Sequence, residues 1–171
     1  MKKILLVIDM QKDFVDGSLG TKEAQEIVPA VVKKVRDFQG ELIFTMDTHA
    51  PEYLKTQEGR NLPVEHCIKG TPGHEIIPEL QPFTENAKVF EKITFGSVDL
   101  CAYLKSIEKE IESIELVGLC TDICVISNAL LLKAAMPEIP MSVDAGCCAG
   151  VTPEKHEAAL ETMRSCQVAV H

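Results

Sequence analysis

Short apolar runs recur along the chain, and several of them end at a charged residue. Residues 4–8 form a continuous apolar run that stops at Asp9, and the mostly apolar residues 42–46 stop at Asp47. Apolar runs of this length are typical of strands that are buried on both faces, as in a parallel sheet. The pattern predicts these two strands and four more, over 88–92, 114–119, 140–144 and 167–170.

Between the predicted strands the apolar residues follow a helical spacing. Residues 23–38 carry apolar side chains three and four positions apart, and Gly40 ends the pattern. Thr121 and Asp122 are typical N-cap residues, and so is Thr152, which precedes a proline. The pattern therefore predicts further helices over 97–107, 122–135 and 153–165.

Three segments lack a clear strand or helix pattern. Residues 10–17 are polar and predict a loop, whereas residues 75–80 predict a short helical turn. Residues 48–73 form a long segment that contains proline and glycine. Long loops inside a compact domain are usually functional, so we expect this segment to contribute to a site.

Strands and helices alternate along the whole chain. This alternation predicts one α/β domain over residues 1–171, with three layers: a mainly parallel, six-stranded sheet between two layers of helices. A chain of 171 residues is long enough to bury a full core without disulfides. The sequence contains neither G-x-G-x-x-G nor a Walker lysine loop, which argues against the usual nucleotide-binding sites.

Charge and composition exclude several classes of partner. The formal net charge of −9 argues against nucleic-acid binding, which needs a basic surface. No lysine or arginine cluster indicates a membrane surface, and no apolar stretch is long enough to span a bilayer. The apolar run near the N-terminus is too short for a signal peptide, and the seven cysteines are an odd number. We therefore expect a cytoplasmic protein with free thiols.

Chemically active side chains follow several of the predicted strands. Asp9 follows the first strand, Lys92 ends the third, Asp144 ends the fifth, and Cys124 lies in the first turn of the helix after the fourth. Because carboxyl ends of parallel strands meet at one edge, these residues should lie together there. A helix start lowers the pKa of a thiol, so Cys124 is a candidate nucleophile, with Asp9 as its general base and Lys92 stabilising both.

Two backbone groups complete this candidate site. The N–H groups of Cys120 and Cys124 lie at the turn before the helix, where an oxyanion could accept hydrogen bonds from them. Each residue also has a simpler interpretation. Asp144 is expected to be a turn residue, and a cysteine on an apolar helix face is often only a small buried side chain.

A second group of residues has the chemistry of a metal site. Asp47 and His49 follow the second strand, and Glu58 and His66 lie in the long segment after it. Carboxylates and imidazoles together suit zinc, manganese or iron. Cys67, next to His66, is an alternative metal ligand, because a thiolate also binds zinc.

Two motifs resemble those of a known family. Residues 9–14, D-M-Q-K-D-F, are similar to the D-x-Q-x-D-F motif of the isochorismatase-like cysteine hydrolases, which include the nicotinamidases. Residues 118–125, G-L-C-T-D-I-C-V, resemble their G-x-x-T-D-x-C-V nucleophile motif, and the resemblance covers essentially the whole chain. It implies a catalytic triad of Asp9, Lys92 and Cys124, a cis peptide before Cys120, and a six-stranded, mainly parallel Rossmann-like fold.

The resemblance also implies a divalent metal, most often zinc. Nicotinamidases bind it through a D-x-H motif and a later histidine, and Asp47, His49 and His66 occupy those positions. Glu58 is placed where some members add a carboxylate. In nicotinamidases the metal holds the pyridine nitrogen of the substrate while the thiol attacks the carboxamide.

The predicted substrate contacts depart from the nicotinamidase pattern. Nicotinamidases commonly carry two tryptophans near the metal, whereas this chain has no tryptophan. The predicted substrate-binding side chains are Gln11, Phe14 and Phe95, with Phe14 as the clearest aromatic wall.

These features together predict a cysteine amidohydrolase. The best single substrate is nicotinamide, converted to nicotinate and ammonia through a thioester on Cys124. One alternative is hydrolysis of another small amide or of an N-carbamoyl or ureido compound. Another is a non-enzymatic thiol redox or ligand-binding module that uses Cys120 and Cys124. The expected partners are a small-molecule amide and, because family members are often oligomers, a second copy of the chain.

Overall fold

The computed structural model describes all 171 residues. A six-stranded sheet with the strand order β3-β2-β1-β4-β5-β6 forms its centre, and all neighbouring strands are parallel. The strands are β1 (Lys2–Ile8), β2 (Glu41–Asp47), β3 (Lys88–Lys92), β4 (Ile111–Leu119), β5 (Met141–Ala149) and β6 (Ala169–Val170). The six predicted strands are therefore all present, most of them one to three residues longer or shorter than expected.

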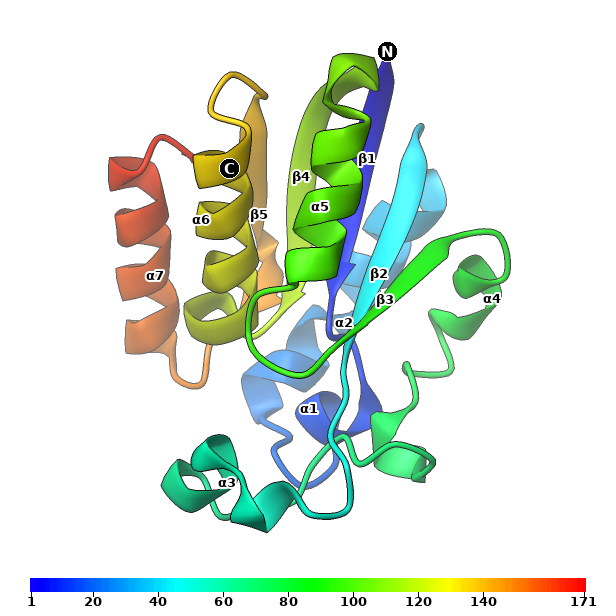
Figure 1. Ribbon diagram of the computed structural model, residues 1–171, viewed down its shortest axis with the longest axis vertical. Coiled ribbons are helices and arrows are strands. Elements are labelled where there is room, and N and C mark those ends of the chain that lie inside the picture. The colour runs from blue at the N-terminus through cyan, green and yellow to red at the C-terminus, as the bar shows by residue number, and fades with distance from the viewer.

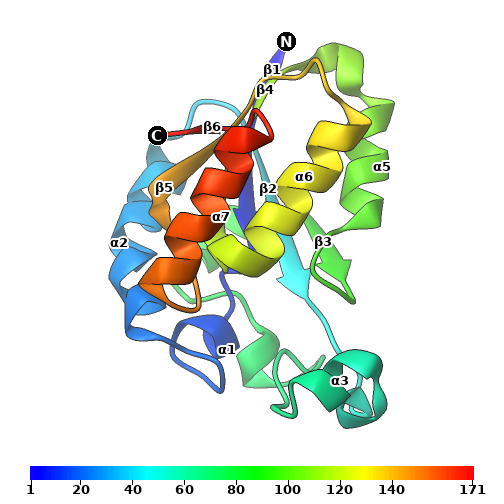
Figure 2. The same cartoon turned by 90° about the vertical axis from the view of Figure 1, so that its left-hand side faces the viewer.

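Helices cover both faces of the sheet. In Figure 1, α5, α6 and α7 stand in front of the strands and α2 lies behind them, and Figure 2 shows the same layers from the side. The long helices are α2 (Lys22–Asp37), α5 (Val98–Ser106), α6 (Ile126–Ala135) and α7 (Pro153–Ser165). The short ones are α1 (Lys12–Val15), α3 (Gln57–Asn61) and α4 (Gln81–Thr84). No helix combines the length and apolar composition that a bilayer-spanning segment needs.

The alternating side chains of β1 supply both halves of the core. Ile4, Leu6 and Ile8 pack into one apolar cluster with α5, α6 and α7, whereas Leu5 and Val7 pack into the other with α1 and α2. All five side chains are completely buried. A strand that faces helices on both sides needs apolar residues at every position, which explains the continuous run in the sequence.

One local prediction is wrong and another holds only in part. Residues 10–17 include the helix α1, whose Phe14 and Val15 are buried; a helix of four residues is too short to show a period. The expected helical turn over 75–80 covers only the second half of that segment, where the N–H groups of Leu80 and Gln81 donate to the Ile77 carbonyl; a 3₁₀ turn, Pro72–His74, precedes the segment and α4 follows it. Prolines at the first turn of both short helices mark where they begin.

The start of the helix after β4 also differs from the prediction. A π-helical turn, Thr121–Val125, precedes α6, and Cys120 is its N-cap. Thr121 and Asp122 therefore lie inside the turn and do not cap it. The Thr121 hydroxyl instead lies 2.7 Å from Nδ1 of His156, and Asp122 accepts a hydrogen bond from the Val151 N–H.

Asp144 does not lie at the end of its strand. The strand β5 continues to Ala149, and its pairing with β4 shifts register on the way, so that Cys148 and Ala149 lie opposite Gly118 and Leu119. The Asp144 carboxylate lies 2.8 Å from the Lys34 ammonium on α2. The expectation that Asp144 collects with the other strand-end residues is therefore wrong.

Gly118 lets β4 pass close to β1. Its φ is +117°, and a Cβ built on it would lie 2.1 Å from the Ile8 carbonyl oxygen. Gly118→Ala should therefore lower the free energy of unfolding by about 3 kcal/mol or more, from backbone strain and overpacking together. Gly70→Ala is the control, because Gly70 has φ +86° but open space around it and should lose only about 1–2 kcal/mol. Urea unfolding that gives equal losses for both variants would contradict the close approach.

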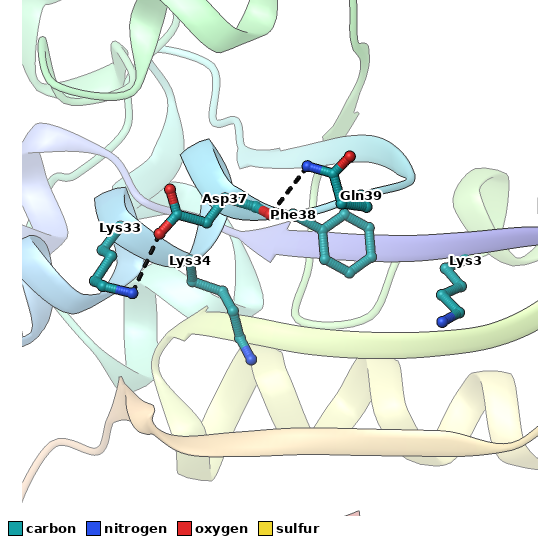
Figure 3. Close-up of a pocket in the computed structure, with 6 residues that line it drawn as sticks. All are labelled: Lys3, Lys33, Lys34, Asp37, Phe38 and Gln39. Carbon is teal, nitrogen blue, oxygen red and sulfur yellow. Dashed lines mark hydrogen bonds and ion pairs between the residues drawn. The ribbon is translucent and has the colours of Figure 1, made fainter.

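A shallow hollow opens at the amino ends of the strands. Figure 3 shows its lining side chains, Lys3, Lys33, Lys34, Asp37, Phe38 and Gln39. Lys33 and Gln39 bond to the side chain and the carbonyl of Asp37. This hollow lies at the opposite edge from Asp9 and Lys92, so it is separate from the site described below.

Candidate active site

The structure brings Asp9, Lys92 and Cys124 together at the carboxyl edge of the sheet. The Lys92 Nζ lies 2.6 Å from Oδ2 of Asp9 and 3.4 Å from Sγ of Cys124. Asp9 is completely buried, and Lys92 and Cys124 are each only 5% exposed. A carboxylate, an ammonium and a thiol are thus held in contact away from bulk water, as the sequence predicted.

Thr45 fixes the orientation of Asp9. Its hydroxyl donates a 2.6 Å hydrogen bond to Oδ1 of Asp9, and the Asp9 N–H points back at Thr45. Asp9 itself has φ +47°, an uncommon conformation for a residue other than glycine. Its Oδ2 forms the ion pair with Lys92 but accepts no hydrogen bond of regular geometry. This oxygen is therefore free to accept a proton.

Lys92 lies among several acceptors. Besides Asp9 and Cys124, its ammonium lies 3.0 Å from the Thr94 carbonyl and 3.4 Å from Oδ1 of Asp47. Burial disfavours the charge, but the carboxylates of Asp9 and Asp47 outweigh it and raise the pKa of Lys92 well above its usual range. Lys92 is therefore a permanent positive charge at the centre of the site.

The expected low pKa of Cys124 is not found. Burial, followed by the negative charge of Asp9, raises the pKa of the Cys124 thiol well above its ordinary value, and Lys92 opposes this only in part. Burial also raises the pKa of Asp9. Cys124 therefore rests as a thiol beside a carboxylate that is a stronger base than one in water.

The backbone before Cys124 has the expected unusual feature. The Leu119–Cys120 peptide bond is cis although no proline is present, as the family resemblance implies. The Cys120 N–H is not engaged in any turn, loop or cap hydrogen bond, whereas the Cys120 carbonyl accepts from Ile123 and Val125. The Cys120 N–H is therefore available as an oxyanion donor.

Asp47, His49, Glu58 and His66 form one compact group. Their ligand atoms all lie within 4.8 Å of one another. Oδ2 of Asp47 lies 2.9 Å from Nε2 of His49 and 3.4 Å from Nε2 of His66, and Oε1 of Glu58 lies 3.7 Å from both imidazoles. Two carboxylates and two imidazoles suit a divalent metal. Cys67, the alternative ligand, is not in this group.

Neighbouring groups hold the two imidazoles in place. Nδ1 of His66 lies 2.8 Å from the Val64 carbonyl, which leaves Nε2 directed at the carboxylates. The Tyr53 ring packs against His49 and His66, with centroid distances of 4.7 and 4.9 Å, and Phe14 lies 5.5 Å from His66. A histidine whose other nitrogen is hydrogen-bonded in this way is typical of a metal ligand.

Gln11 supports the metal group and does not face a substrate. Its Nε2 donates to the carbonyls of Asp47 and His74, each at 2.8 Å, and its Oε1 accepts from the Asp47 N–H at 2.7 Å. All donors of the amide are thereby used, and Gln11 is completely buried. These bonds hold the backbone of Asp47 in position and leave no donor of the amide for a substrate. The prediction that Gln11 binds the substrate therefore does not fit the structure.

Gln11→Ala should weaken metal binding about 10- to 100-fold, because the backbone of one ligand loses its support. The measurement is a competition titration with a chromogenic chelator. Gln39→Ala is the control, since the Gln39 amide bonds only to the Asp37 carbonyl, in the hollow at the amino ends of the strands. Unchanged metal affinity in the Gln11 variant would contradict this role.

The two predicted aromatic contacts differ in position. Phe14 is 9% exposed and packs against His66. Phe95 is 42% exposed and lies in the loop that follows Lys92. Both remain predicted substrate contacts.

Three further residues organise the site and were missed. Thr45 orients Asp9, Asp13 accepts the Cys67 N–H at 2.8 Å, and Asn128 bonds to the carbonyl of Cys124. Thr45 is the one polar residue in an apolar run, and Asn128, together with Ser127, interrupts another, which is a usable signal. Asp13 lies in a polar segment, and its place in the D-x-Q-x-D-F motif is the only signal for it.

Comparisons with known proteins agree with this site. The family model described as the isochorismatase domain matches residues 3–171. An uncharacterized isochorismatase family protein, PncA of Bacillus subtilis, is 34% identical over 145 residues, covering 76% of this chain and 78% of that protein.

Solved structures show the same fold. A nicotinamidase/pyrazinamidase PncA from Bacillus subtilis superposes with a TM-score of 0.88 at 30% identity, over 99% of both chains. A pyrazinamidase of Pyrococcus horikoshii in complex with zinc gives 0.84 at 26% identity, over 100% of this chain and 99% of that one. These matches confirm the predicted three-layer fold. The chain belongs to the isochorismatase family.

Proposed function

We propose that this protein is a metal-dependent cysteine amidohydrolase that converts nicotinamide to nicotinate and ammonia. One observation carries the proposal: the Lys92 ammonium contacts Asp9, Cys124 and Asp47, so it joins the thiol chemistry to the metal group. Relatives named nicotinamidase/pyrazinamidase, including one from Mycobacterium tuberculosis that is 25% identical over 184 residues, support this substrate.

The first half of the reaction forms a thioester. Oδ2 of Asp9 takes the proton from Cys124, and Lys92 stabilises the thiolate that results. The thiolate attacks the carboxamide carbon, and the N–H groups of Cys120 and Cys124 stabilise the oxyanion. The protonated Asp9 then gives its proton to the leaving nitrogen. The C–N bond breaks, ammonia leaves, and the acyl group stays on Cys124.

The second half restores the enzyme. Asp9, again a carboxylate, takes a proton from a water molecule that attacks the thioester carbon. The C–S bond breaks, the sulfur receives the proton back from Asp9, and nicotinic acid leaves and loses its own proton to water to become nicotinate. One general base thus serves both halves, and the Lys92 ammonium contacts both its Oδ2 and the Cys124 sulfur.

Asp47, His49, Glu58 and His66 would hold the metal, for which we propose zinc. When bound, it supplies a Lewis-acid anchor for the ring nitrogen of the substrate. The hydrogen bonds from His49 and His66 outweigh the effect of burial and hold the pKa of Asp47 well below its usual range. Asp47 is therefore ionised at neutral pH, as a ligand must be.

Removal of the metal with a chelator should lower nicotinamide hydrolysis about 100-fold, because the anchor of the substrate is lost. Added zinc should restore it. The measurement is ammonia release, with metal content followed by mass spectrometry.

Two comparisons sharpen this test. His171→Ala tests whether the relevant metal could instead lie at a second group of carboxylates and an imidazole, formed by Glu115, Asp144 and His171. This variant should keep both its activity and its sensitivity to the chelator. A ureido or carbamoyl substrate should be included in the panel. Turnover of that substrate by the metal-free protein, without any turnover of nicotinamide by the loaded protein, would move the substrate to the alternative class.

A further inference from the structure

Asn128 joins the helix of the candidate nucleophile to the loop that follows Lys92. It lies on α6, four residues after Cys124, and is completely buried. Its Nδ2 donates to the Cys124 carbonyl at 2.8 Å and to the Phe95 carbonyl at 3.1 Å, and its Oδ1 accepts the Ser97 N–H at 2.9 Å. Both donors and one acceptor of the amide are therefore used.

The loop over residues 93–97 is held to Lys92 at its other end. The Lys92 ammonium donates to the Thr94 carbonyl at 3.0 Å, one residue before the carbonyl that Asn128 binds. A Cβ on Gly96 would lie 3.5 Å from the Ser127 carbonyl, so the loop packs directly on α6. Asn128 is the only side chain of α6 that hydrogen-bonds to this loop.

These bonds form a closed ring around the reacting groups. It runs from Cys124 through Asn128 to the loop, from the Thr94 carbonyl to Lys92, and from Lys92 back to the Cys124 sulfur at 3.4 Å. The ring constrains the separation of ammonium and sulfur from both sides. Without Asn128, the loop and the helix would be joined only by packing.

We propose that Asn128 is a positioning residue that sets the distance between Lys92 and Cys124. This inference rests on the proposed function, in which Lys92 stabilises the thiolate. Asn128 touches neither the sulfur nor the ammonium, so it acts through the backbone on both sides. Misplacement of a reacting pair by about 1 Å can cost about 100-fold in rate, so a positioning role has a measurable consequence.

The main test is Asn128→Ala. We expect kcat for nicotinamide to fall about 10- to 100-fold, because Lys92 is no longer held against the thiolate, with KM changed less than about 3-fold. Alkylation of Cys124 by iodoacetamide at fixed pH, located by peptide mass spectrometry, should slow by a similar factor. A merely structural residue would lower stability without this selective loss of kcat and thiol reactivity.

Two further variants keep the test decisive. Asn128→Asp has the same shape and still accepts the Ser97 N–H, but its second oxygen repels the Phe95 carbonyl. It should show the same losses in kcat and alkylation rate, and it replaces the alanine variant if that variant does not fold. Thr21→Ala is the control for stability: it removes the N-cap of α2, at about 1 kcal/mol, on the other face of the sheet, and should leave kcat and alkylation unchanged.

The outcomes separate this inference from the proposed function. Alkylation needs no substrate, so it tests the role of Asn128 even if the wild-type protein hydrolyses no amide. Folded Asn128 variants with wild-type kcat and wild-type alkylation rates would overturn the positioning role. Slow alkylation in these variants, together with no amide turnover by the wild type, would keep it and overturn the function.

Discussion

Cys124→Ala should abolish amide hydrolysis, with kcat falling about ten-thousand-fold or more. Removal of the nucleophile from an enzyme whose catalytic groups act as a unit has effects of this size. In this site the loss is complete because Lys92 and Asp9 can only assist the sulfur: one stabilises its charge and the other takes its proton. Ammonia release from nicotinamide, measured for wild type and variant side by side, gives the result directly.

Cys166→Ala is the matched control for Cys124→Ala. Cys166 is an exposed free thiol after α7, so its loss should not change activity. The Cys124 variant should remain folded, because sulfur removal leaves the ion pair of Asp9 and Lys92 intact. Ammonia release that continues at near wild-type rate in Cys124→Ala would show that the thiol is not the nucleophile.

Lys92→Met should remove activity and also lower the free energy of unfolding by about 3–5 kcal/mol. Loss of one partner from a buried ion pair has a cost of this size, because the other charge stays buried without compensation. Here the ammonium lies 2.6 Å from Asp9 and 3.4 Å from Asp47, so two carboxylates lose their cation. Methionine replaces the apolar stem of the side chain and removes only the ammonium group.

Lys69→Met provides the comparison for stability. Lys69 pairs with Glu91 at 2.6 Å, but its side chain is 63% exposed, so water screens the pair and its loss should cost less than about 1 kcal/mol. Guanidinium unfolding of both variants gives the two losses. Equal small losses would mean that water reaches the site of Lys92 and that its charge is not confined as described.

The sequence predicts the strands and helices well because a strand that is buried on both faces appears in the sequence as a continuous apolar run. The run over residues 4–8 became β1, and the acid directly after it, Asp9, lies at the carboxyl edge of the sheet. Lys92 and Cys124 follow from the same rule about strand ends. The rule fails for Asp144 because β5 continues through residues 145–149, which are small and show no clear strand pattern in the sequence.

Side-chain bonds between distant segments were not predictable. Gln11 and Asp47 are bonded across 36 positions, and Asn128 and Ser97 across 31. Motif spacing singles out Gln11, yet only the folded chain shows that its amide is used by the backbone. The pKa of Cys124 was predicted in the wrong direction for a related reason: burial is a property of the whole fold.

The central claim is that a thioester forms on Cys124, and interception by hydroxylamine tests it most directly. Hydroxylamine competes with water for an acyl-enzyme, so the wild-type protein with nicotinamide should yield the hydroxamate together with nicotinate, in a ratio that rises with hydroxylamine concentration. Ammonia release should continue throughout. Release of ammonia with nicotinate as the only acyl product at every hydroxylamine concentration would contradict the thioester and indicate direct attack of water on the amide.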